Sequence, residues 1–275
     1  MRLLVTGGMD PRPLALGRIL VALAAALFTF EWIGVLARVS SGRFLVLPVV
    51  DGWPPPAPNV VFILFAVSLG TSIAMVLGLA GRVPALLVAA TAATVLLIDQ
   101  QTYSNHLVLL MMLALLLGLS GASEALTISR RPRAACVPLW PAFLIKVLIT
   151  TVYIWTALAK INPQYLSGEV LGTYFQPWVP IPDQLLPMAA LASIATEAFL
   201  AVALWIPNTR KIALVVGVGL HLGIVLMLDS PLPLVGFGAL MMAGYVLFIW
   251  HLSSGGSTLG RRWPLRARTP KQPAS

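Results

Sequence analysis

Long runs of apolar residues, separated by short polar stretches, dominate this sequence. Eight runs can be marked, at residues 13–37, 60–80, 83–98, 106–120, 139–161, 186–206, 211–228 and 232–251. A helix needs about 20 residues to cross the hydrocarbon core of a bilayer, so most of these runs are long enough to span it. The third and fourth are short by this measure, and they span if the polar turn between them lies in the interface or dips inward. We therefore predict an all-α, polytopic transmembrane bundle with about eight spans.

The composition agrees with a membrane protein and excludes most other classes. Hydrophobic residues make up 59% of the 275 residues and charged residues only 10%, which lies outside the range of soluble domains. The net charge of +9 could suggest nucleic acid as a partner. However, the basic residues lie in short loops and in the C-terminal tail, where they suit anionic lipid headgroups. The single cysteine, Cys136, rules out an intramolecular disulfide and a cysteine metal cluster.

The distribution of charge predicts the orientation of the chain. With the N-terminus in the cytoplasm, Arg82, residues 129–133, residues 210–211 and the tail all fall on the cytoplasmic side. The opposite side receives five carboxylates and, among basic loop residues, only Arg38 and Arg43; the carboxylates are Asp51, Asp99, Glu169, Asp183 and Asp229. This satisfies the positive-inside rule. We expect a membrane domain at residues 1–252, a disordered basic cytoplasmic tail at 253–275, both termini inside, and residence in the plasma or inner membrane.

Ionisable residues inside apolar runs are the candidates for function, because each costs about 2.5–3.5 kcal/mol at mid-membrane. They are Arg18, Glu31, His106, Lys146, Lys160, Glu197 and His221. Arg18 and Lys146 lie near the expected cytoplasmic starts of their spans. We therefore interpret both as side chains that extend to the lipid headgroups.

Lys160 differs because it ends its apolar run on the expected outer side, against the positive-inside trend. Thr156 lies one helical turn before it and Tyr153 two turns before it, so the three form a polar stripe on one face. Two interpretations remain open. The lysine either extends outward to the lipid surface, or it faces the bundle, where a desolvated lysine gives up its proton more easily and can act as a base or nucleophile.

Three further polar residues accompany this stripe. His106 follows Asn105 in a polar turn on the same expected side as Lys160, as a solvated interface residue or as a partner for a reacting oxygen. Glu197 and His221 lie well inside the sixth and seventh runs. They suit either a structural hydrogen bond between neighbouring helices or a polar site. The histidines and carboxylates lack a metal-binding spacing such as H-x-x-x-H, so no metal site is expected.

Two long outer loops are predicted as well. Residues 49–59 contain a run of prolines, which cannot form a helix interior and should cap the surface. Residues 163–187 are rich in Tyr, Phe and Trp. Such residues suit interfacial anchoring, although the same loop could form a lid over a site that opens outward.

The segment "VYIWTALAKINPQYLSGEVL", residues 152–171, resembles the signature helix of the HTTM (horizontally transferred transmembrane) family, which is related to vitamin K-dependent gamma-glutamyl carboxylase. The matching positions are Tyr153, Ala157, Ala159, Lys160, Ile161, Asn162, Tyr165, Leu166 and Gly168. The step Asn105–His106 at the start of a span is similar to another family feature, as are Glu197 and His221 in the later helices. The similarity runs from about residue 17 to residue 250.

The resemblance implies a chemistry for these positions. In the carboxylase, the lysine matching Lys160 deprotonates reduced vitamin K, oxygenation then generates a strong base, and glutamate is carboxylated. Carried over, Lys160 would be the base for a reduced vitamin K-type quinone and His106 would assist it. Asn105, Tyr153, Thr156, Glu197 and His221 would line the pocket.

The sequence also departs from the carboxylase. Ala159 precedes Lys160 where the carboxylase has a second lysine, and we expect no counterpart of its large lumenal substrate-binding domain. We therefore keep three hypotheses: a carboxylase-like membrane enzyme acting on a peptide or protein at the outer face, a non-catalytic accessory protein for maturation or export of a secreted peptide, and a transporter. The lack of an internal repeat argues against the transporter.

Overall fold

The computed structural model describes residues 7–129, 134–179, 181–229 and 231–253, with side chains described up to residue 250. The expected cytoplasmic tail, except its first residue, and most of the basic cluster at 129–133 lie outside the described residues. Helices coincide with all eight apolar runs. They are α2 (Arg12–Ser40), α3 (Pro58–Leu77), α4 (Val83–Ile98), α5 (Asn105–Leu119), α6 (Trp140–Ala159), α9 (Leu186–Ala203), α10 (Arg210–Met227) and α11 (Pro231–Ser253).

Short elements join these helices. They are the antiparallel pair β1 (Gly8–Met9) and β2 (Val137–Pro138), the 3-10 turns η1 (Gln100–Thr102), η2 (Ala122–Glu124) and η3 (Asp183–Leu185), and the single-turn helices α7 (Pro163–Leu166) and α8 (Glu169–Gly172). The described chain is thus mostly helical, as the apolar pattern predicts. In lipid this is the structure that satisfies every backbone group within one segment.

Six helices of the described chain are long and apolar enough to cross a membrane. They are α2, α3, α6, α9 extended back over η3, α10 and α11. The remaining two, α4 with 16 residues and α5 with 15, are shorter. The chain is therefore a multi-pass membrane protein. Prolines in the first turn start α2, α3, α4, α6 and α9, a position where the missing N–H costs nothing.

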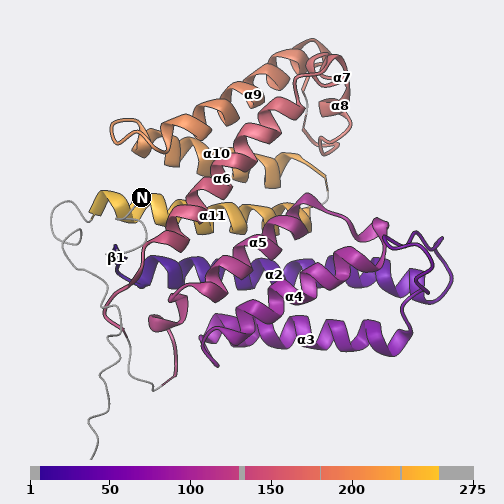
Figure 1. Ribbon diagram of the computed structural model, residues 1–275. Coiled ribbons are helices and arrows are strands. Elements are labelled where there is room, and N and C mark those ends of the chain that lie inside the picture. Colours follow the sequence, from indigo (N-terminus) through magenta and orange to yellow (C-terminus); the bar gives the residue numbers. More distant parts are fainter. Residues whose placement is uncertain (1–6, 130–133, 180, 230, 254–275) are drawn as a thin grey trace, which may run out of the picture.

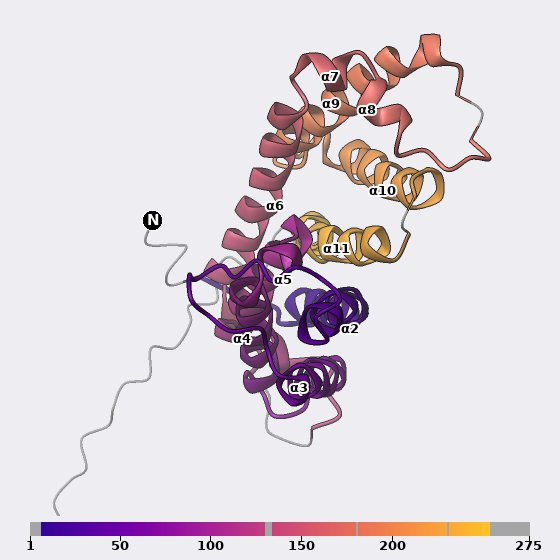
Figure 2. The same ribbon diagram turned by 90° about the vertical axis from the view of Figure 1, so that its right-hand side faces the viewer.

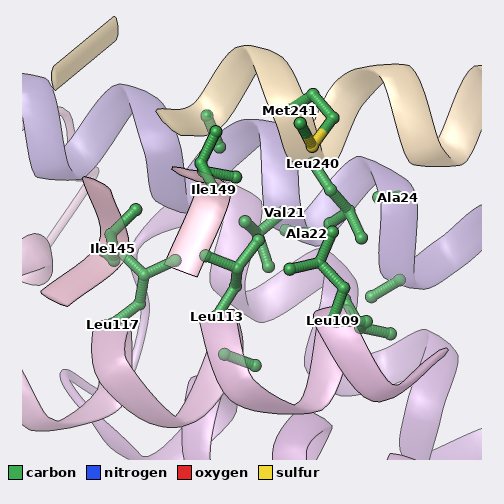
Figure 3. Packing of buried hydrophobic residues seen from close by; sticks show 14 of the residues in the cluster. Val21, Ala22, Ala24, Leu109, Leu113, Leu117, Ile145, Ile149, Leu240 and Met241 are labelled. Atoms are coloured by element: carbon green, nitrogen blue, oxygen red, sulfur yellow. The ribbon is translucent and has the colours of Figure 1, made fainter. Parts of the chain in front are cut away.

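The helices form two groups that α11 connects. Figure 2 looks roughly along α11, α2 and α3, which lie in a row with α4 and α5 beside them, while α6 is seen lengthwise and runs from beside α5 past α11 to α9, and α10 lies on the other side of α11 from α2. Figure 1 shows the same arrangement from the side, with α7 and α8 at the far end of α6 and α9. The main apolar core lies between α2, α5, α6 and α11, where Val21, Leu113, Ile149 and Leu240 interdigitate (Figure 3).

Two sets of polar contacts connect elements of the N-terminal group of helices, α2 to α5. The hydroxyls of Thr29 on α2 and Ser68 on α3 are 2.6 Å apart and buried, which is a typical interhelical bond in membranes. The Asp99 carboxylate, fully buried, accepts hydrogen bonds from the backbone N–H groups of Leu47 at 2.8 Å and Gln101 at 2.9 Å. It thereby ties the loop after α2 to the turn between α4 and α5.

One of the two basic residues expected at the headgroups, Arg18, is buried in the protein instead. Arg18 is only 2% exposed and its Nη2 donates to the carbonyl of Leu126 at 2.6 Å. The expectation was wrong because the segment after η2 folds back over this end of α2 and covers the guanidinium. Lys146 is half-buried, and its ammonium lies 5.1 Å from the centre of the Phe248 ring on α11.

Candidate functional site

Lys160 turns toward the helix bundle and forms an ion pair. Its Nζ lies 2.7 Å from Oε1 of Glu197 on α9, and the two side chains are 24% and 7% exposed. Helix α6 ends just before the lysine because Asn162 precedes Pro163, and a residue before proline avoids the helical conformation. The Asn162 side chain then caps α7 by accepting from the N–H of Tyr165 at 2.9 Å. Of the two interpretations of Lys160, the structure therefore supports the inward one.

Helix α7 supplies a second wall for the lysine. The Lys160 ammonium lies 5.4 Å from the centre of the Tyr165 ring, within range of a cation–π contact. The Tyr165 hydroxyl is 2.9 Å from Oγ of Ser193 on α9. The start of the long loop at residues 163–187 thus packs against the site.

Gly168 allows this loop to approach α9 so closely. Its φ of +81° is in the left-handed region, which glycine adopts without steric cost. A Cβ at this position would lie 2.6 Å from the backbone carbon of Leu186 and 2.8 Å from the nitrogen of Pro187. The structure therefore explains why the lysine motif has a glycine at this position: only a residue without a side chain lets α8 begin against the start of α9.

A second polar group lies about two helical turns earlier along α6, where α6, α10 and α11 meet. The Tyr153 hydroxyl is 2.9 Å from Nε2 of His221 and also hydrogen-bonds the hydroxyl of Tyr245. The exposed fractions of Tyr153, His221 and Tyr245 are 2%, 5% and 2%. Glu197 and His221 therefore do not pair with each other. Glu197 contacts Lys160 at the end of α6, and His221 contacts Tyr153 further back on the same helix.

Sequence reasoning missed Tyr245. A phenol in an apolar run carries no formal charge, so it was not counted among the costly residues, although it is the only tyrosine of the last run. Gly217 on α10 makes room for it, since a Cβ there would overlap the Tyr245 hydroxyl. Tyr245 thereby joins α11 to the polar groups of α6 and α10.

Two buried polar atoms of the site have no hydrogen-bond partner among the described residues. They are Oε2 of Glu197 and Nδ1 of His221. In either tautomer of His221, Nε2 is used by Tyr153 and Nδ1 stays unpaired. Buried polar atoms are normally satisfied, and an exception indicates a place for water or a ligand. Both atoms belong to side chains at least 90% buried, so the site has two interior points at which it can bind a polar group.

His106 approaches the site through aromatic rings. Its ring stacks on Phe28 at 6.0 Å between centroids and lies 4.8 Å from Phe237 on α11. Phe237 in turn lies 5.4 Å from the His221 ring. His106 is thus separated from His221 by one ring, and no direct contact with Lys160 is found.

The other two sequence candidates form hydrogen bonds with groups other than the side chains of the polar cluster, which consists of Lys160, Glu197, Tyr153, His221 and Tyr245. Asn105 is exposed, and its Oδ1 accepts from the Tyr103 hydroxyl at 2.9 Å. The Thr156 hydroxyl donates to the carbonyl of Val152 on its own helix at 2.9 Å. Of the seven candidates, the structure therefore brings Lys160 to Glu197 and Tyr153 to His221, places His106 one ring further away, and gives Asn105 and Thr156 hydrogen-bond partners other than these side chains.

Glu31 on α2 lies near the start of α5, in a cavity that contains none of the residues of the polar cluster. It lines this cavity of about 50 Å³ together with Phe28, Gln101, Tyr103 and Ser104. This volume has room for water rather than for a larger ligand. Phe28 also stacks on His106, so its ring lies between this cavity and the histidine.

The family model of the HTTM domain matches residues 8–250, which is most of the chain and includes every residue of the cluster. No curated protein and no solved structure matches the chain.

Proposed function

Because the chain belongs to the HTTM family, we propose that its polar cluster binds a hydroxyl-bearing, membrane-soluble ligand and removes a proton from it. The ligand class is that of a reduced vitamin K-type quinone, following the resemblance of the lysine motif to vitamin K-dependent gamma-glutamyl carboxylase. Removal of this proton would start an oxidation or a carboxylation at the outer face. In a carboxylation, a peptide or protein would be the substrate that receives the carboxyl group.

The observation that carries this proposal is the partly buried ion pair whose carboxylate has a second, unpartnered oxygen. Nζ of Lys160 lies 2.7 Å from Oε1 of Glu197. The other carboxylate oxygen, Oε2, is buried and has no hydrogen-bond partner among the described residues. A charge pair inside a membrane bundle is expensive to keep, and apolar residues of similar volume would be as stable or more so. The pair therefore favours a functional over a purely structural role. The Tyr153–His221–Tyr245 group supplies a second polar contact for the same ligand.

We also propose that all eight apolar helices, the shorter α4 and α5 included, cross the plasma or inner membrane, with both termini in the cytoplasm. In this arrangement the start of α5 and the end of α6 lie on the same outer side. The distribution of basic loop residues supports it. Helices α4 and α5 cross as a short hairpin whose tip, η1, is tied to the loop after α2 through Asp99.

Thiol labelling tests the short hairpin directly. In a Cys136→Ala background, Tyr103→Cys at the tip and Leu79→Cys at the base place single thiols at exposed positions. We expect a membrane-impermeant reagent to label Tyr103→Cys in intact cells and Leu79→Cys only after the membrane is opened. Labelling of both thiols from the same side would contradict a crossing of α4 and α5.

Quinol oxidation tests the proposed chemistry. The purified protein in lipid nanodiscs is given menaquinol or phylloquinol with oxygen, and epoxide formation is measured. Lys160→Ala should lower the rate at least about a hundredfold, as expected when one charge-stabilising or proton-transferring group is removed. Lys211→Ala, which removes an exposed lysine at the start of α10, should leave the rate unchanged. A folded protein without turnover on either quinol would overturn the proposal in favour of an accessory role in peptide maturation.

A further inference from the structure

The ion pair limits what Lys160 can do in the resting protein. A protonated lysine has three donors and no lone pair, so it cannot accept a proton. To become a base it would first have to release its own proton, and Glu197 at 2.7 Å would then lose the cation that compensates it. An uncompensated carboxylate in so buried a position is strongly unfavourable. The pair therefore favours a charged Lys160.

Glu197 has the opposite properties. One of its oxygens, Oε1, accepts from Lys160 at 2.7 Å, and the other, Oε2, is buried without a partner. An ionised carboxylate is an acceptor at both oxygens. A ligand hydroxyl placed beside Oε2 would donate its hydrogen bond to this atom, which puts the proton on the path of transfer.

We infer that Glu197 Oε2 is the proton acceptor of the site and that Lys160 stays charged and stabilises the oxyanion that forms. This inference deepens the proposed function and rests on it. In the transfer, the O–H bond of the ligand breaks, a new O–H bond forms at Oε2, and the electron pair remains on the ligand oxygen. Lys160 then exchanges one anionic partner for another.

The advantage of this division of roles is that no charge in the site is left without a partner during the transfer. Before the transfer the site contains an ammonium and a carboxylate; afterwards it contains an ammonium, a neutral carboxylic acid and a ligand anion. One ion pair exists at each stage and the net charge stays at zero. In surroundings that solvate charge poorly, such an exchange avoids the uncompensated charge that a neutral lysine would leave on Glu197.

Amine labelling tests the charge of Lys160 without any quinol. The folded protein is treated with acetic anhydride, and acetylation of Lys160 is compared with that of Lys211 by peptide mass spectrometry. We expect slow labelling of Lys160 and at least a fivefold increase in Glu197→Gln, because the amide removes the charge that holds the proton while the side chain keeps its shape. Glu169→Gln, at an exposed carboxylate near the site, should change nothing. Equal rates in wild type and a folded Glu197→Gln would overturn the inference.

Quinol binding under anaerobic conditions tests the acceptor. The absorbance of bound 2-methyl-1,4-naphthoquinol distinguishes the neutral form from the anion. Wild type and Lys160→Arg should bind the anion, and Glu197→Gln should bind with an anion fraction at least tenfold smaller. An anion fraction unchanged in Glu197→Gln would overturn the role of Glu197 and leave the proposed function in place. Absence of quinol binding by wild type would overturn the proposed function, and the role of Glu197 with it, whatever the labelling shows.

Discussion

Replacing Lys160 by methionine is expected to destabilise the folded protein by about 3 kcal/mol, near the lower end of the cost of breaking a buried ion pair from one side. The variant leaves the Glu197 carboxylate, 7% exposed, without its cation. The lower end applies because about a quarter of the Lys160 side chain is exposed, and a partly exposed pair contributes less than a fully buried one. Thermal unfolding in detergent, followed by circular dichroism, measures the effect, with Lys211→Met as the control.

The opposite variant and the double variant complete this test. Glu197→Leu should cost less, about 1–2 kcal/mol, since the remaining lysine is long enough to move its charge toward the membrane surface. Lys160→Met combined with Glu197→Leu should recover most of the stability, because two apolar residues replace the pair and no charge stays buried. Costs that simply add in the double variant would show that the two residues do not interact in the folded protein.

The sequence predicted the helices well because each bilayer-crossing segment carries its own signal. The run at residues 83–98 coincides with α4, and the run at 13–37 falls within α2. Lys160 could also be recognised, since a lysine at the end of an apolar run, two residues before Asn-Pro, is unusual whatever surrounds it. These features depend on local sequence alone.

Partners could not be predicted, because they depend on how the helices rotate and pack. Glu197 and His221 looked like natural partners on neighbouring helices, yet the rotation of α9 directs Glu197 to Lys160 and that of α10 directs His221 to Tyr153. Arg18 appeared to lie at the lipid surface by its position in α2. A segment more than 100 residues later covers it, and no local pattern contains that information.

Gly217→Ala is the second substitution with a large expected effect, because it forces Tyr245 out of the polar cluster. A Cβ at Gly217 would overlap the Tyr245 hydroxyl and lie 2.5 Å from its Cζ. Tyr245 is 2% exposed and has no room to withdraw without breaking its hydrogen bond with Tyr153. We expect a loss of about 2 kcal/mol: overpacking costs about 1–3 kcal/mol, and the better helix propensity of alanine offsets only part of it.

Gly219 on the same helix provides a matched control, since a Cβ there would meet nothing within 4 Å. Gly219→Ala should leave the unfolding temperature unchanged or raise it, whereas Gly217→Ala should lower it. The clash is assigned to Tyr245 by adding Gly217→Ala to a Tyr245→Ala variant, where the ring is gone and the extra methyl should cost nothing. An equal cost in both backgrounds would mean that the methyl disturbs α10 itself. A cost that disappears without the ring would establish that Gly217 is needed so that α11 can bring its tyrosine to Tyr153 and His221.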